Sequence, residues 1–137
     1  MGILTSITNI FRTGELKSGD KKSPGTIGEN LACKKLKKCG YEIIEKNFKT
    51  KFGEIDIIAL ADDTICFIEV KARTSTYHGN PEEFVTRSKQ KKLWKAASIY
   101  IQGHLIEYEN YRFDVVSVDL KDGSITLFTN AFEADFG

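Results

Sequence analysis

A short run of strand-forming residues, Cys66-Phe67-Ile68-Glu69-Val70-Lys71, places the strongest constraint on the fold of this chain. Alternate side chains of a strand face opposite sides of a sheet, and both sides of this run hold apolar residues. The pattern predicts an interior strand that is covered on both faces. Glu69 and Lys71 share one of these faces, where a strand with a purely structural role would not place two charges.

The chain as a whole predicts one α/β domain. Its 137 residues fit a single compact unit, and 41% apolar with 28% charged residues is ordinary for a globular protein. Residues 1–25, in which glycine, serine and lysine are frequent, predict a flexible N-terminal segment, so we expect the domain to span residues 26–137. Periodicity predicts the element order αβββαββ.

The expected elements follow from helical spacing, strand alternation and turn residues. A helix from Thr26 should end at Gly40, and a second should run from an N-cap at Thr86 to Gln102. Strands are expected over 41–48, 51–60, 64–72, 112–120 and 124–129. Short polar connections at 61–63 and 121–123 predict hairpins between the flanking strands.

Composition excludes several classes of protein. No stretch approaches 18 consecutive apolar residues, so a membrane span is not expected. Three cysteines without any C-x-x-C spacing do not predict a disulfide framework or a zinc site. We expect reduced thiols and a cytoplasmic location. The net charge of +1 identifies no partner, although basic residues dominate the first 50 positions and acidic ones the last 37.

The strand before the Glu69 strand also carries acids. Glu54 and Asp56 are expected to share a face with Ile58, while Ile55 and Ile57 cover the other face. A hairpin would bring Asp56 close to Glu69. Glu29, on the first helix, is a candidate third carboxylate. Glu54 is consistent either with a supporting acid at the site or with a turn residue after Gly53.

Carboxylates clustered in this way suit metal-assisted hydrolysis of a phosphodiester. Mg²⁺ takes oxygen ligands, commonly one or two carboxylates with waters and substrate phosphate. Asp56 and Glu69 could hold one or two such ions, and Lys71 could orient or deprotonate the attacking water or offset charge on the phosphorus. The alternative is that Glu69 and Lys71 form a pair on a solvated sheet face.

Several motifs in fixed order extend this interpretation. They are Gly28-Glu29, Gly40-Tyr41, Asn47-Phe48, Gly53-Glu54-Ile55-Asp56-Ile57-Ile58-Ala59, Phe67-Ile68-Glu69-Val70-Lys71-Ala72-Arg73 and Arg112-Phe113-Asp114-Val115-Val116. Over residues 26–133 the chain closely resembles the YraN-like family of small uncharacterised bacterial proteins. Through it the chain is similar to the PD-(D/E)XK nuclease superfamily, near archaeal Holliday-junction resolvases and restriction endonucleases.

The resemblance implies a restriction-endonuclease-like mixed central sheet flanked by helices, with a nuclease site using Mg²⁺ or Mn²⁺. By position, Asp56 and Glu69 correspond to the metal carboxylates, Lys71 to the catalytic lysine and Glu29 to the helix-borne acid. The superfamily's proline before the first aspartate is Ile55 here. Structured DNA is the implied substrate, and resolution of a junction would favour a homodimer.

Basic residues around this strand suggest a nucleic-acid contact. Arg73, Arg87 and Lys89 could position phosphates without reading sequence, and Gln90 faintly resembles a glutamine of related nucleases. The alternative is that the basic side of the second helix is merely solvated.

Two other functions stay open: a nucleic-acid-binding module that does not cleave, and an RNA-processing nuclease. Arg112 and Asp114 are interpreted as a structural ion pair, and Trp94 as a core residue.

Overall fold

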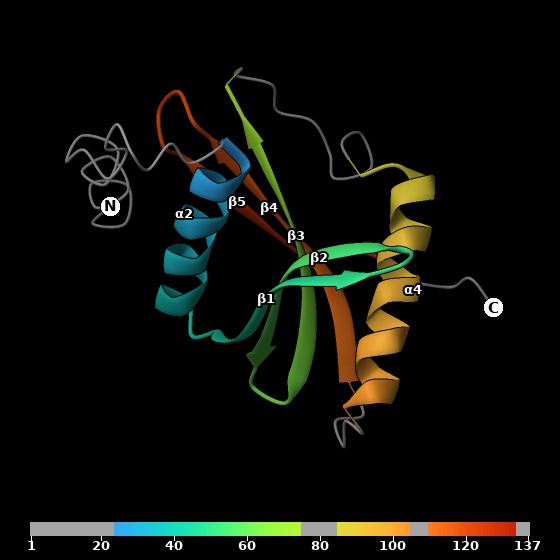
Figure 1. Cartoon of the computed structure of the whole chain (residues 1–137). Coiled ribbons are helices and arrows are strands. Elements are labelled where there is room, and N and C mark those ends of the chain that lie inside the picture. Colours follow the sequence, from blue (N-terminus) through green and yellow to red (C-terminus); the bar gives the residue numbers. More distant parts are fainter. Residues whose placement is uncertain (1–23, 75–84, 105–109, 134–137) are drawn as a thin grey trace, which may run out of the picture.

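The protein is described by a computed structural model over residues 24–74, 85–104 and 110–133. Within these ranges a five-stranded mixed sheet lies between two helices (Figure 1). The elements in chain order are α2 (Pro24–Lys38), β1 (Glu42–Thr50), β2 (Gly53–Ala61), β3 (Thr64–Arg73), α4 (Arg87–Gly103), β4 (Asn110–Asp119) and β5 (Ile125–Phe132). This order confirms the predicted α/β class and its αβββαββ arrangement.

The strands follow one another across the sheet in the order β1-β2-β3-β4-β5. The β3–β4 pair is parallel, and the other three pairs are antiparallel. A parallel pair needs a long crossover, and α4 lies in the chain between β3 and β4. Neither helix of the described ranges is long and apolar enough to cross a membrane.

Each face of the sheet has its own apolar core. Leu31 and Leu36 of α2 pack with Ile68 of β3 on one face, and Leu93 of α4 packs with Phe67 on the other. Phe67 and Ile68 are neighbours in sequence, and neither exposes more than 1% of its surface. The prediction that β3 is an interior strand is therefore confirmed.

The helix ends follow the predicted capping chemistry. Gly40 adopts φ 92°, a left-handed conformation that glycine tolerates without strain, just after α2. The Thr86 side chain accepts a hydrogen bond from the Lys89 backbone N–H at 3.2 Å and caps α4. Because α2 begins at Pro24, residues 24 and 25 belong to the helix rather than to the predicted flexible segment. The rest of that segment, residues 1–23, lies outside the described residues.

The outer half of the β1–β2 hairpin departs from the predicted alternation. Ile55 packs with Ile58 in the core under α4, whereas Ile57 packs in the core under α2, so the expectation that Ile55 and Ile57 share a face is wrong. Asn47, which lies opposite Asp56 in the register, adopts φ 56°. Both strands of the hairpin bend away from the rest of the sheet, and the far end of the hairpin lies against α4 (Figure 1).

Helix α2 approaches β3 closely at Gly28. A Cβ atom added to Gly28 would lie 2.7 Å from the Ala72 Cβ, well inside van der Waals contact. Glycine at this position allows the first turns of the helix to lie directly on the end of β3. The approach matters for the site because the next residue is Glu29.

We expect Gly28→Ala to lower the free energy of unfolding by about 1–2 kcal/mol, since overpacking outweighs the better helix propensity of alanine. Chemical denaturation measures the change. Ala72→Gly introduced with it should recover part of the loss by reopening the space. Gly103→Ala is the control, because nothing lies within 4 Å of a Cβ at Gly103. Equal losses in the single and double variants would contradict the close-approach explanation.

Candidate metal and phosphodiester site

Asp56 lies at the point where β2 separates from β3. The paired register between these strands begins at Ile57↔Ile68, one residue further along β2. The backbone N–H of Val70 therefore has no β2 carbonyl opposite it, and it donates to the Asp56 Oδ2 at 2.8 Å. This hydrogen bond fixes the carboxylate in the gap between the two strands.

Glu69 lies next to Asp56, as the predicted hairpin requires. Its side chain is only 4% exposed. Burial, a hydrogen bond to Asp56 and the charge of Asp56 together raise the pKa of Glu69 to about 8, against the opposing effect of Lys89 and Lys71. Without a metal ion, the Glu69 carboxyl group therefore keeps its proton at neutral pH.

Two lysines face the buried Glu69 carboxylate. The Nζ atoms of Lys71 and Lys89 lie 3.8 Å and 3.5 Å from its Oε2 atom. Lys71 follows on the same strand face, as predicted. Lys89 comes from the first turn of α4, which the Thr86 cap orders. Sequence reasoning placed Lys89 only in a basic rim, whereas the structure brings it to the acids.

Asp56 also belongs to a group of three carboxylates. Oxygen atoms of Glu29, Glu54 and Asp56 all lie within 4.8 Å of one another, and each of the three residues is partly buried. The close approach at Gly28 carries Glu29 to this position. The structure thus favours the interpretation of Glu54 as a site acid. An all-oxygen donor set of this kind fits the ligand preference of Mg²⁺ or Mn²⁺.

The electrostatics of Glu29 reflect its neighbours. Burial raises its pKa, and the charges of Asp56 and Glu54 raise it further, while a hydrogen bond from Asn47 and the charge of Lys46 lower it. Sequence reasoning did not identify Asn47 as part of the site. Asparagine is disfavoured within strands, so its position in the middle of β1 was the available signal.

The remaining predicted nucleic-acid contacts are Arg73, Arg87 and Gln90. Arg73 ends β3 and is half-buried, and Arg87 begins α4 and is exposed. Gln90 is 6% exposed, and its Nε2 donates to the Val85 carbonyl at 3.0 Å, which anchors the start of α4. Phosphate binding by these three residues stays a prediction.

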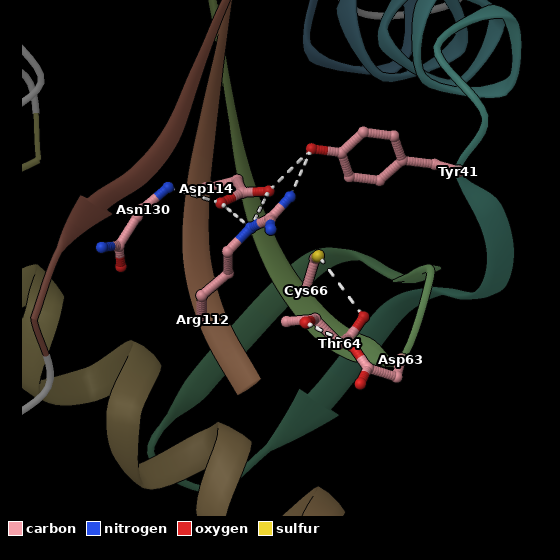
Figure 2. A network of polar contacts seen from close by, with 7 residues as sticks. All are labelled: Tyr41, Asp63, Thr64, Cys66, Arg112, Asp114 and Asn130. Carbon is pink, nitrogen blue, oxygen red and sulfur yellow. Dashed lines mark hydrogen bonds and ion pairs between the residues drawn. The ribbon is translucent and has the colours of Figure 1, made fainter. Parts of the chain in front are cut away.

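A separate buried network involves Asp114 of β4 and none of the site acids (Figure 2). Asp114 is fully buried and accepts hydrogen bonds from Arg112 Nε at 3.0 Å, the Tyr41 hydroxyl at 3.1 Å and the Asn130 backbone N–H at 2.8 Å. The predicted structural ion pair between Arg112 and Asp114 is confirmed. Burial, with Asp114 next to it, raises the pKa of the Cys66 thiol to about 12, so this thiol stays protonated.

The fold and the site together define a small mixed α/β domain in which acids from one helix and two strands converge beside two lysines. The chain belongs to the uncharacterised protein family UPF0102, whose family model matches residues 28–118. This confirms the family predicted from the motifs. The family description and the names of the relatives state no activity.

Several bacterial relatives match most of the chain. A UPF0102 protein of Caldanaerobacter subterraneus subsp. tengcongensis is 46% identical over 112 residues, covering 82% of this chain and 92% of the relative. One from Clostridium botulinum strain Kyoto is 46% identical over 117 residues, covering 82% and 95%. One from Clostridium perfringens strain ATCC 13124 is 53% identical over 100 residues, covering 72% and 80%.

Proposed function

We propose that this domain is a metal-dependent endonuclease that hydrolyses phosphodiester bonds in structured DNA. The observation that carries the proposal is the position of Asp56, which interacts with the carboxyl group of Glu69 and also clusters with the acids Glu29 and Glu54. Lys71 faces the same cluster. Carboxylates that converge with a lysine at a partly buried point are the groups that metal-assisted hydrolysis requires.

Asp56 and Glu69 would hold Mg²⁺ or Mn²⁺, with Glu29 and Glu54 extending the donor set. A bound ion would stabilise negative charge on the attacking and departing oxygens. The chain itself orders these ligands: the Val70 N–H holds the Asp56 Oδ2, and the Asn47 side chain hydrogen-bonds Glu29. Preordered ligands reduce the reorganisation that metal binding would otherwise require.

The two lysines supply positive charge at Glu69. As an ammonium group Lys71 orients the attacking water or offsets charge on the phosphorus, and only as the free amine would it deprotonate that water. Lys89 balances the carboxylate and contacts a phosphate next to the scissile bond. Both ammonium groups favour the ionised form of Glu69, which is the form that can bind a metal ion.

The surroundings of the site suggest how the protein meets its substrate. Arg73 and Arg87 contact backbone phosphates, which position a duplex without reading its sequence. Junction cleavage would use two copies of the chain in a homodimer, because two symmetric cuts need two sites. The exposed free thiol of Cys39 fits a reducing compartment, and we place the protein in the cytoplasm.

Cleavage of labelled junction, flap, single-stranded and duplex DNA tests the proposal. We expect the wild-type protein to cut with Mg²⁺ or Mn²⁺ and not with EDTA. Glu69→Ala should reduce cleavage by at least about 100-fold, as expected for a group that acts in the reaction itself. Asp62→Asn is the matched control: it removes an exposed carboxylate from the β2–β3 turn, where φ of 55° suits asparagine.

Two results would overturn the proposal in favour of the alternatives. Binding without metal-dependent cleavage of any substrate would identify a nucleic-acid-binding module that keeps the fold. Cleavage of RNA alone, in parallel reactions at equal concentration, would identify an RNA-processing nuclease. Equal loss of activity in Glu69→Ala and Asp62→Asn would place the reaction elsewhere.

A further inference from the structure

The tip of the β1–β2 hairpin presents an aromatic ring among cations. In the described part of the chain three large apolar side chains are exposed: Ile44, Phe52 and Tyr111. Phe52 is 38% exposed, and the Nζ atoms of Lys51 and Lys95 each lie 5.2 Å from its ring centroid. An aromatic face in a cationic setting is a recognition feature rather than part of an apolar docking patch.

The hairpin tip lies against α4, and hydrogen bonds within its turn fix the backbone on either side of Phe52. The Thr50 Oγ1 accepts hydrogen bonds from the backbone N–H groups of Phe52 at 3.1 Å and Gly53 at 3.2 Å, and donates to the Gly53 carbonyl at 2.9 Å. Gly53 lies against Lys92, whose Cβ would be 3.5 Å from a Cβ at that glycine. The ring is therefore presented in a preordered position, which lowers the entropic cost of binding.

The tip adjoins the candidate metal site. Glu54, which directly follows Gly53, is one of the three clustered acids. Along α4, lysines recur every third residue: Lys89 faces Glu69, Lys92 lies against Gly53 and Lys95 lies over Phe52. A row of lysines along α4 thus leads from the acids to the aromatic ring.

We propose that Phe52 is a stacking platform for an unpaired nucleobase, and that Lys51, Lys92 and Lys95 bind the phosphates on either side of that base. The inference rests on the proposed function in taking a nucleic acid as the substrate. It adds that the preferred substrate carries an unpaired nucleotide beside the scissile bond. Flaps, junctions and single-strand boundaries meet this requirement, whereas a continuous duplex does not.

The chemistry of the tip favours this occupant. A nucleobase offers a flat π face to stack on the ring, and its backbone supplies the anions that the surrounding lysines attract. Phe52 stays 38% exposed with the two lysines beside it, and ammonium groups on flexible side chains can turn towards phosphate. An acidic protein would satisfy the cations without using the ring, so substitutions of the ring distinguish the two occupants.

Binding measured without cleavage tests the inference. In a Glu69→Gln background, which keeps the DNA intact, fluorescence of 2-aminopurine placed at a single-strand boundary reports stacking. We expect Phe52→Leu to weaken binding of boundary-containing DNA about 10-fold and to remove the fluorescence change, with blunt duplex unaffected. Phe52→Trp should retain both signals. Tyr111→Leu removes an exposed aromatic ring outside the lysine row, and it should change neither.

Equal affinities for boundary-containing DNA with and without the Phe52→Leu substitution would overturn the inference. Equal affinities of the protein with Phe52 for boundary-containing DNA and for blunt duplex would overturn it as well. The inference would also be overturned if an acidic protein bound more tightly than boundary-containing DNA and if Phe52→Leu left that binding unchanged. The acidic protein would then be the occupant of the tip. Thermal melting of each variant shows that it is folded. The cleavage assay with Glu69→Ala is independent of this test. Cleavage by Phe52→Leu that keeps the full wild-type preference for single-strand boundaries would therefore contradict the stacking role alone and leave the proposed function standing.

Discussion

Replacing Glu69 by glutamine is expected to stabilise the metal-free protein while abolishing its proposed activity. The carboxyl group is buried beside Asp56, and its pKa of about 8 shows that the folded protein disfavours the ionised form. Glutamine has nearly the same shape, needs no charge, and its amide can donate to Asp56. We expect the melting temperature of Glu69→Gln in EDTA at pH 9 to exceed that of the wild type by about 5 °C or more.

The stability of Glu69→Gln relative to the wild type should increase as the pH rises. Below the unfolded-state pKa near 4.5, Glu69 is protonated whether folded or unfolded, so the substitution changes little. As pH rises from about 4.5 to about 8, only the unfolded state releases the proton, and wild-type stability falls relative to Glu69→Gln. Above pH 8 the folded protein must bury the ionised carboxylate, and the difference is largest.

Metal binding should make the wild type more stable than Glu69→Gln, the reverse of the order in EDTA. A cation that binds only the folded protein raises its melting temperature, and we expect Mg²⁺ to stabilise the wild type more than Glu69→Gln. Asp62→Asn should follow the wild type in both conditions within about 0.5 kcal/mol. A lower melting temperature of Glu69→Gln at pH 9 would show that the contacts with Lys71 and Lys89 outweigh the cost of burial.

The fold was predictable because its elements carry local signals. The interior position of β3 follows from apolar residues on both of its faces, and the limits of the helices follow from Gly40 and Thr86. Strand boundaries shifted by up to three residues, since pairing with neighbouring strands rather than local sequence decides where a ladder ends. The bend of the β1–β2 hairpin near Asn47 and Asp56 was not predictable from the sequence. It depends on the packing of the far end of the hairpin against α4, which is a tertiary effect.

The candidate site was predictable where two strands are joined by a tight hairpin. Asp56 and Glu69 meet because the short turn at 61–63 leaves few possible registers. Lys89 could not be assigned to Glu69 in advance, since its position depends on where the crossover helix lies over the sheet. Phe52 and Asn47 were missed for a related reason. The exposure of the Phe52 ring and the contact of Asn47 with Glu29 both depend on the same bend of the β1–β2 hairpin.

The opposite effect on stability is expected at Asp114. Asp114→Asn should lower the free energy of unfolding by about 3 kcal/mol, because it leaves the partly buried Arg112 guanidinium without its carboxylate and turns an amide donor towards other donors. Chemical denaturation at pH 7 measures the loss. Metal binding and cleavage should persist in the folded fraction, since Asp114 contacts none of the site acids.

Tyr41→Phe separates the hydroxyl from the ion pair in the same network. The hydroxyl donates to Asp114 and accepts from Arg112 at 2.9 Å, so its removal leaves the pair at 3.0 Å intact. We expect a loss of about 1 kcal/mol, well below that of Asp114→Asn. Similar losses in the two variants would mean that the hydroxyl, and not the charge pair, joins the end of α2 to β4. We therefore expect the paired and hydrogen-bonded Asp114 to stabilise this fold, and the buried Glu69, whose proposed role is to hold a metal ion, to weaken it until an ion binds.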